Sequence, residues 1–434
     1  MMKLTLKQIR SFIIGLSLLL LAGAVGYWIG QGRISFVPAG ESSSQIKIDR
    51  RVPADKQGLD FNLFWEVWDK VEETYLERKN IDQKKMVLGA ISGMVASLGD
   101  PYTVFLPPSE NKDAKDDLRG DFEGVGIQIG YSKEQKLAVV APLSGTPAEA
   151  AGLKASDLIL RIVDVAQGID QDTLGIALPE AVKLIRGPKG SQVKLTIQRE
   201  GLEKPFEVSL ERATIVVKSV EVRFVRSAGL SQDKKEKVVA VLKLSRFGER
   251  TYEEWQEAID NIQKQIASSQ NFAGVILDLR NNPGGFLQGA VFIGSEFLSS
   301  GAVVLQDKGI DGKETFSVNR QGQLLREPLV VLINGGSASA SEIVAGALQE
   351  VKRAKLVGEK TFGKGTVQEA QDLPGGAGLH VTVARWLLPS GKSIDKEGVT
   401  PDFEVKMDEE DQTAGQADQT EDPQLQKAIE LLTQ

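Results

Sequence analysis

Three short segments of this sequence carry residue types that could do chemistry. The first, residues 334–342, lies between an apolar strand pattern and a predicted helix and contains Ser337, Ser339 and Ser341. Ser339 and Glu342 have the spacing of a helix capping box. A serine on a sharp strand-to-helix turn can instead be a nucleophile, because its hydroxyl is exposed and the helix N-terminus stabilises negative charge. The spacing alone leaves both interpretations open.

The second segment, residues 358–368 (GEKTFGKGTVQ), nearly matches a phosphate-binding P-loop. We reject nucleotide binding, because Gly365 stands where a Mg²⁺-binding hydroxyl is required and a strand pattern follows where a helix is required. Two interpretations remain: a hairpin with a solvated lysine, or a buried lysine that acts as a general base. Lys364 is the better base, because Glu359 would keep its neighbour Lys360 charged.

A lysine base must lose its charge near the working pH. The ordinary pKa of lysine is about 10.4, so burial must lower the pKa of Lys364 by about two to three units to leave the amine neutral near pH 8. We expect Phe362 and Val367 to supply the apolar cover that this shift requires.

The third segment contains Pro283, Gly284 and Gly285, which three residues separate from the end of a predicted strand. Proline and glycine in this order are typical of a type II turn. The two glycines could also present bare backbone N–H groups to a negatively charged oxygen, as in an oxyanion hole. Taken alone, the segment favours the turn.

Composition restricts the chemistry further. The chain has 434 residues, no cysteine and a single histidine, His380, which lies in a predicted strand. This excludes disulfides, a thiolate nucleophile, Cys-ligated metals and a His-rich metal site, and we do not expect His380 to be catalytic. A base would therefore be a lysine or a carboxylate. The net charge of −7 gives no basic field for nucleic acid, so we expect no nucleic-acid partner.

All three segments lie in residues 213–406, where strand and helix patterns alternate. This alternation predicts an α/β core with a largely parallel sheet. The expected strands are 238–244, 273–279, 302–305, 329–333 and 355–357, and the expected helices are 252–267, 286–298 and 340–351. A strand pair, 366–373 and 379–388, follows these elements. Residues 407–434 are an acidic tail that ends in an amphipathic helix, 423–432, which we expect to dock back on the core.

Residues 104–212 show short strands and one good helix, and this region resembles a PDZ domain. The likeness lies in Gly124-Val125-Gly126-Ile127, followed by TPAEAAGL at 146–153 and LIRGPKG at 184–190. In PDZ domains such a loop turns backbone N–H groups towards a terminal carboxylate, and the bound peptide adds as a strand. One departure is the stretch 162–176, which replaces the usual tight hairpin.

The N-terminus predicts a membrane anchor. Residues 12–29 are mostly apolar, and three cations lie within residues 3–10 before them. Such a stretch can span a bilayer, and the cations favour a cytoplasmic N-terminus. The apolar run continues past a possible cleavage site at 22–24, so we expect an uncleaved single-pass anchor in the cell membrane. Residues 1–32 would be the stub and anchor and 33–58 a linker, with the rest outside the cytoplasm.

Residues 59–103 predict a module of two helices. Aromatic residues recur at helical spacing after residue 60, and Asp82 is the expected N-cap of the second helix. Gly99-Asp100-Pro101 is a stop signal for that helix. The module either packs on another part of the chain or forms a dimerisation arm of a homodimer.

Taken together, these segments resemble the carboxyl-terminal processing peptidases, also called tail-specific proteases, over about residues 60–432. The motifs GSASASEIVAGALQ and GEKTFGKGTVQ carry the likeness. The resemblance implies an α/β protease core, with layers like those of crotonase and Clp protease, preceded by a PDZ-like β-rich domain and an N-terminal helical module. It also implies a serine endopeptidase in which a Ser-Lys pair replaces Ser-His-Asp.

The resemblance implies specific roles for residues of this chain. Ser339 would be the nucleophile, Lys364 the general base and Gln368 the residue that orients the lysine. The oxyanion donors would be the backbone amides of Gly284, Gly285 and Ala340. The substrates would be proteins with a free, apolar C-terminus held by Gly124, Val125, Gly126 and Ile127.

No metal, nucleotide or other cofactor is expected, and activity should rise from about pH 6 towards about pH 8–9 as the lysine loses its proton. The alternative is a scaffold of the same fold that binds C-termini without cleaving them.

Overall fold

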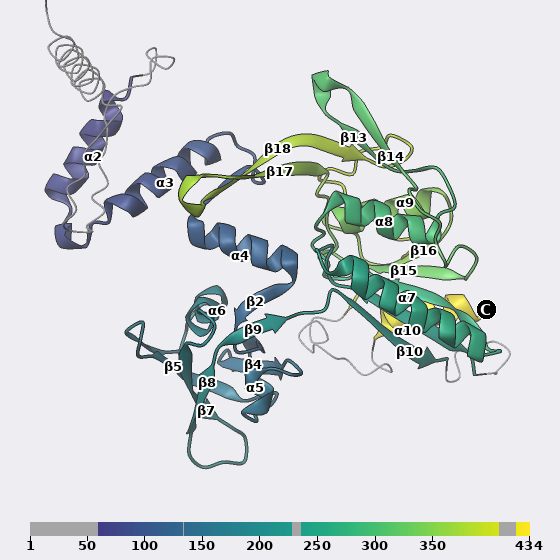
Figure 1. Ribbon diagram of the computed structural model, residues 1–434, viewed down its shortest axis with the longest axis horizontal. Coiled ribbons are helices and arrows are strands. Elements are labelled where there is room, and N and C mark those ends of the chain that lie inside the picture. The colour runs from purple at the N-terminus through teal and green to yellow at the C-terminus, as the bar shows by residue number, and fades with distance from the viewer. Residues whose placement is uncertain (1–59, 133, 228–235, 408–421) are drawn as a thin grey trace, which may run out of the picture. The chain divides into compact units, whose positions relative to one another are not determined.

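The structure is a computed structural model that describes residues 60–132, 134–227, 236–407 and 422–434 (Figure 1). The chain divides into two compact units, residues 1–86 and 87–434. The predicted anchor and linker, residues 1–58, lie outside the described residues. In the described ranges, no helix is both long enough and apolar enough to cross a membrane.

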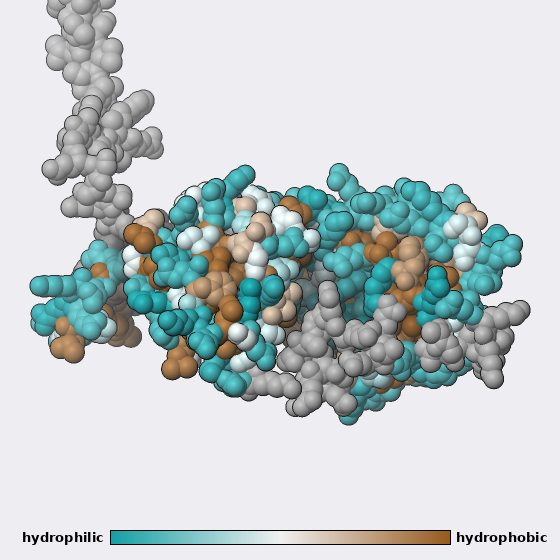
Figure 2. Space-filling view, turned by 90° about the horizontal axis from the view of Figure 1, so that it is seen from below, coloured by the Kyte–Doolittle hydropathy of each residue, from teal (hydrophilic) through white to brown (hydrophobic). Residues whose placement is uncertain are grey.

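In the first unit, the described residues form α2 (Asn62–Thr74), the short 3-10 helix η2 (Arg78–Asn80) and the start of α3 (Gln83–Ala96). Asp82 caps α3 as predicted, because its Oδ1 accepts the backbone N–H groups of Lys84 and Lys85 at 2.9 and 3.1 Å. Apolar side chains of α2 stay exposed: Leu63, Phe64, Val67 and Val71. Figure 2 shows that brown, hydrophobic residues are interspersed with teal, hydrophilic ones on the face in view. The homodimer and the packing module both stay predictions.

The main sheet of the second unit has six strands in the order β10–β11–β12–β15–β16–β19. Their bounds are Val220–Arg226, Val238–Leu244, Phe272–Asp278, Leu329–Ile333, Lys355–Gly358 and Phe403–Glu404. All neighbouring strands run parallel except β10, which is antiparallel to β11. The predicted, largely parallel core with alternating helices is therefore confirmed, but the strand expected at 302–305 does not belong to this sheet and pairs antiparallel in a second one.

Helices cover both faces of this sheet (Figure 1). Side chains on alternate positions of a strand point to opposite faces, so each strand feeds two cores. One core joins the sheet to α7 (Thr251–Ser268), α8 (Leu287–Phe297) and α9 (Ala340–Glu350). The other joins it to α10 (Pro423–Thr433), through Leu425, Ala428 and Ile429. The C-terminal helix thus docks back on the core, as predicted.

A second, antiparallel sheet is built from distant parts of the chain. Its strands are β1 (Val104–Leu106), β13 (Ala302–Asp307), β14 (Lys313–Ser317), β17 (Thr366–Asp372) and β18 (Gly378–Leu387). The predicted strand pair appears as β17 and β18. β1 pairs with β18, with Val104 opposite His380, so the segment that follows α3 is fixed beside the strand pair.

The PDZ-like region has its own sheet, in the order β3–β4–β5–β7–β8, with β6 paired to β5. The strands are Ile127–Tyr131, Leu137–Pro142, Leu158–Asp164, Gln192–Gln198 and Phe206–Glu211, and β6 is Ile169–Asp172. Two helices, α5 (Pro147–Ala150) and α6 (Leu178–Ile185), complete it, and β2 (Asp121–Gly124) pairs with β9 (Ala213–Val216) beside it. The unusual stretch at 162–176 forms the β5–β6 hairpin.

Several observed elements were not among the predicted ones, and β10 and α4 are two of them. β10 has the sequence VEVRFVR, in which apolar and charged residues alternate at most positions. Such alternation is typical of a strand and could have been recognised in the sequence. Helix α4 (Pro108–Arg119) reads PSENKDAKDDLR, which has no apolar period. It is delimited instead by its ends: a proline in the first turn, and Gly120 in the left-handed conformation at φ 77°.

Candidate active site

Ser339 lies on the turn that joins β15 to α9. Its φ of 55° and ψ of −115° are unusual for a residue with a side chain, and an N-cap normally has extended backbone angles. The hydroxyls of Ser337 and Ser341, the two flanking serines, are buried and donate to the carbonyls of Leu279 and Asn282. Ser339 is only half-buried. Of the three serines, it has the position and the backbone conformation of an exposed strand-to-helix turn.

Glu342 joins the serine segment to the lysine segment. This glutamate has no exposed surface, and it completes the predicted capping box by accepting the N–H of Ser339 at 2.8 Å. The same oxygen, Oε2, accepts the N–H of Lys364 at 2.9 Å. The other oxygen, Oε1, accepts the hydroxyl of Thr361 at 2.6 Å and the N–H of Gly363 at 2.7 Å. Burial raises the pKa of this carboxyl, and the four hydrogen bonds oppose that rise.

Lys364 is half-buried, and burial holds its pKa below the ordinary lysine value. The negative charges of Asp100 and Glu342 act in the opposite direction. Of the two residues expected to cover the amine, Phe362 is 56% exposed and Val367 is partly buried. The ring of Tyr102 lies with its centre 5.0 Å from the Nζ of Lys364. In the described part of the chain, Nζ makes no hydrogen bond to Ser339 or Gln368.

Gln368 lies on β17, close behind Lys364 in the chain. Its Nε2 donates to the hydroxyls of Thr366 and Thr382, at 2.8 and 3.2 Å. These two bonds fix the amide and leave its carbonyl oxygen without a partner among the residues described. The free oxygen can accept a hydrogen bond from an amine.

The Pro283-Gly284-Gly285 turn lies against the serine turn. A Cβ on Gly284 would come within 2.8 Å of the Ser339 Cβ and 3.0 Å of the Ala340 nitrogen, so only glycine permits this approach. The N–H of Gly284 donates to the Asn282 side chain at 2.9 Å. The N–H groups of Gly285 and Ala340 have no acceptor within the described ranges. The amide of Ala340, which directly follows Ser339, and the amide of Gly285 in the neighbouring turn are therefore free donors in the described structure.

The predicted peptide-binding loop precedes an edge strand. Val125 is buried, and Gly126 has a φ of 77°, where a side chain would clash with Thr146. The carbonyl of Gly126 accepts the N–H of Leu143 and the hydroxyl of Thr146. Within the described residues, β3, which begins at Ile127, pairs with β4 alone, and α6 contacts it. The loop is thus rigid, and one side of β3 is open to an added strand.

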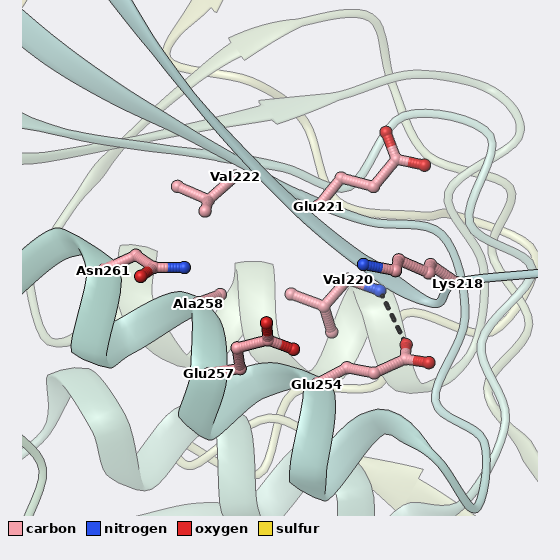
Figure 3. Close-up of a pocket in the computed structure, with 8 residues that line it drawn as sticks. All are labelled: Lys218, Val220, Glu221, Val222, Glu254, Glu257, Ala258 and Asn261. Atoms are coloured by element: carbon pink, nitrogen blue, oxygen red, sulfur yellow. Dashed lines mark hydrogen bonds between the residues drawn. The ribbon is translucent and has the colours of Figure 1, made fainter. Parts of the chain in front are cut away.

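Other candidate sites lie apart from these residues. The described residues contain no cluster of His, Asp and Glu that could hold a metal ion. A surface cavity of about 400 Å³ lies between β10 and α7 (Figure 3). Its Glu254 already accepts the N–H of Val220 at 3.2 Å, and none of the residues predicted for the site lines this cavity.

Sequence reasoning missed three residues near Lys364. Glu342 was expected only as a capping residue, although it also binds the lysine segment. The sequence indicated only a helix stop at Asp100 and nothing for Tyr102, which directly follows that stop signal. They lie far from Lys364 in the chain, and the pairing of β1 with β18 brings their segment to the site. We find no local pattern that would have revealed this contact.

Three known families match parts of this chain. Peptidase family S41 matches residues 238–405, and the PDZ domain matches residues 114–198. The activating protease CtpB N-terminal domain matches residues 20–109. A solved S41 protease structure from Bacteroides fragilis covers 84% of this chain and 96% of its own, with a TM-score of 0.54 and 18% identity, which is a likeness of fold. The fold and these matches define an S41 peptidase that carries a PDZ domain.

Two similar proteins show which kind of S41 peptidase this chain is. The carboxyl-terminal-processing protease of Synechocystis sp. is 39% identical over 378 residues, which cover 86% of this chain and 83% of that protein. The carboxy-terminal processing protease CtpA of Bacillus subtilis is 34% identical over 347 residues, which cover 80% and 69%. The chain therefore belongs to the carboxyl-terminal processing proteases, and it is a serine peptidase.

Proposed function

We propose that this protein is a serine endopeptidase that binds the C-termini of protein substrates through its PDZ domain and cleaves them with Ser339, Lys364 and Gln368. One observation carries the assignment: the buried carboxylate of Glu342 holds the serine and lysine segments together through their backbone N–H groups. A lone structural cap would need only the bond to Ser339.

In this scheme, Lys364 acts as the base in its neutral form. It takes the proton from the Ser339 hydroxyl as the oxygen attacks the substrate carbonyl, and the N–H groups of Gly285 and Ala340 stabilise the resulting oxyanion. The intermediate collapses when the C–N bond breaks and the leaving amine takes the proton from the lysine. Water then attacks the acyl-enzyme, again with Lys364 as base, and releases the new C-terminus. The oxygen of Gln368 orients the amine.

The PDZ domain would capture the substrate through its free carboxylate. The loop from Gly124 to Ile127 offers backbone N–H groups, and the open side of β3 can pair with an extended peptide. The loop and the open strand bind the peptide through backbone groups and do not select its side chains. A preference for apolar C-terminal residues would therefore come from the side chains of β3 and α6. Amidation of the peptide C-terminus should therefore abolish most of the binding.

The test compares the unmodified protein with Ser339→Ala and Lys364→Arg on an unfolded protein substrate. We expect cleavage by the unmodified protein only, and equal cleavage by all three would refute the proposal. Binding without cleavage by the unmodified protein would indicate the scaffold instead. The Ser339→Ala form should retain substrates, and sequencing their C-termini would identify the recognised residues.

We also propose that residues 12–29 anchor the protein, with the peptidase outside the cytoplasm. Support comes from the apolar run and from the cations that precede it. The full chain should resist alkaline extraction from membranes, whereas a chain starting at residue 33 should not. Protease added to intact spheroplasts should degrade the PDZ domain, because that domain would lie outside the cytoplasm. Extraction of the full chain with soluble proteins would contradict the anchor.

A further inference from the structure

The side chain of Lys364 is held by a loop from a distant part of the chain. This loop, residues 100–103, connects α3 to β1. Its Tyr102 places the ring centre 5.0 Å from the Nζ of Lys364, a distance at which the ring face attracts a cation. An uncharged amine gains much less from the ring. The contact therefore favours the protonated lysine, the form that cannot act as a base.

The loop is rigid enough to hold this position. The carboxylate of Asp100 accepts the N–H of Tyr102 at 3.0 Å and the hydroxyl of Thr103 at 2.6 Å. The Thr103 hydroxyl in turn accepts the N–H of Thr382 on β18 at 3.0 Å. Thr382 also binds Gln368, the residue proposed to orient the lysine. A continuous set of hydrogen bonds thus connects the loop to the strand pair behind the active site.

The charges around Lys364 come from several elements. Asp100 on the loop and Glu342 on α9 both favour the ammonium form. Two more distant groups belong to the same surroundings: His380 on β18, whose own pKa is lowered by burial and then by Lys364, and Asp395 in the turn after β18, which accepts the N–H of Gly365 at 3.3 Å. The Glu342 carboxylate accepts four hydrogen bonds that hold the site together, so Asp100 is the charge near Lys364 that can be removed without breaking the link between the serine and lysine segments.

We propose that Asp100 and Tyr102 are positioning residues of the peptidase reaction: together they hold the Nζ of Lys364 and set how readily it gives up its proton. This inference rests on the proposed role of Lys364 as the general base. It gives the loop between α3 and β1 a direct part in the pH dependence of cleavage. The lysine is an effective base only in its neutral form, and both the ring of Tyr102 and the carboxylate of Asp100 stabilise the charged form instead.

The first test is the pH profile of kcat/KM for loop variants. Asp100→Asn removes a negative charge and Tyr102→Leu removes the ring face, so both should move the acid limb to lower pH, by about half a unit to one unit. Tyr102→Phe keeps the ring face and should restore the wild-type midpoint. Asp260→Asn removes an exposed carboxylate on α7 and should not shift the profile. A loss of activity with no shift in any loop variant would mean that the loop is merely structural.

The second test measures the lysine directly, without catalysis. In the Ser339→Ala background, the rate at which acetic anhydride modifies Lys364 is followed by mass spectrometry across the pH range. The midpoint of this curve should fall in Asp100→Asn and Tyr102→Leu. An unchanged midpoint in both variants overturns the inference, even if Lys364→Arg abolishes cleavage. If Lys364→Arg cleaves normally, the proposed base is wrong, while the labelling curves still report whether the loop controls the amine.

Discussion

Ser339 and Lys364 donate their backbone N–H groups to the same oxygen atom, the Oε2 of Glu342, at 2.8 and 2.9 Å. This shared acceptor fixes the distance between two segments that belong to different loops. The carboxylate is buried and makes two further hydrogen bonds, so it can be replaced only at a cost to the geometry of both segments.

Glu342→Gln should therefore lower kcat far more than it changes KM. An amide offers one oxygen in place of two, so two of the four donors would face its NH₂ group. Because small misplacements of reacting groups are costly, we expect a loss of about 100-fold in kcat. Steady-state kinetics on an unfolded substrate would measure it, with Glu200→Gln, an exposed loop carboxylate, as the control. Near-normal kcat would show that the bridge is dispensable.

Cleavage should become faster as the pH rises. Burial lowers the pKa of Lys364 from 10.5, so its neutral fraction grows with pH across a window below that value. The profile of kcat/KM should show one rising limb from the lysine. His380→Gln should leave this limb in place, because burial and then Lys364 keep the pKa of His380 below 6.5. A limb that disappears with His380 would assign the base to the histidine.

Gln368→Ala should slow the chemical step without weakening substrate capture. The Gln368 side chain is fixed by Thr366 and Thr382, and its free oxygen is the group proposed to orient Lys364. Loss of this acceptor should reduce kcat by about 10- to 100-fold, because misplacing a catalytic group by about 1 Å can cost about 100-fold. Gln371→Ala, an exposed glutamine on the same strand, is a matched control. Single-turnover rates that match the wild type would argue against an orienting role.

Gly126→Ala should weaken the binding of peptides with a free C-terminus. Gly126 has a φ of 77°, and an added Cβ would clash with Thr146, so the loop would have to move. Gly152→Ala is a close control, because its φ is 75° but nothing lies within 4 Å of the added Cβ. Fluorescence anisotropy with a labelled apolar peptide should show a Kd at least about tenfold higher for Gly126→Ala than for Gly152→Ala. Equal affinities would exclude the loop as the carboxylate site.

Arg212→Met should loosen α6, the helix that contacts β3. Arg212 is fully buried, pairs with Asp164 at 2.7 Å and donates to the carbonyls of Leu184 and Ile185 at the end of α6. Removing one partner of a buried ion pair costs about 3–5 kcal/mol. Hydrogen exchange of the α6 amides should accelerate strongly, while amides of α9 in the peptidase core should keep their protection. Unchanged exchange in α6 would mean that the helix is held by its apolar face alone.

Much of the site was predictable because its residues are close together in sequence. Ser339 and Glu342 lie in one helical turn, and Lys364 and Gln368 lie just before and at the start of one strand. Local spacing made Ser339 and Lys364 candidates, and the family resemblance gave Ser339, Lys364 and Gln368 their roles. The alternation of apolar strands and helices likewise indicated the parallel core, since burial on both faces requires continuous apolar strands. β10 could have been found in the same way from its alternating side chains.

The tertiary structure alone decided which groups surround the lysine. Tyr102 reaches Lys364 only because β1 pairs with β18, and such long-range pairing leaves no local pattern in a single sequence. The same holds for the dual use of Glu342, whose capping role is readable from spacing, whereas its bond to Lys364 depends on how two loops meet. The residue types determine which chemistry is available to this chain. The tertiary packing determines which groups surround Lys364 and therefore how strongly its amine holds a proton.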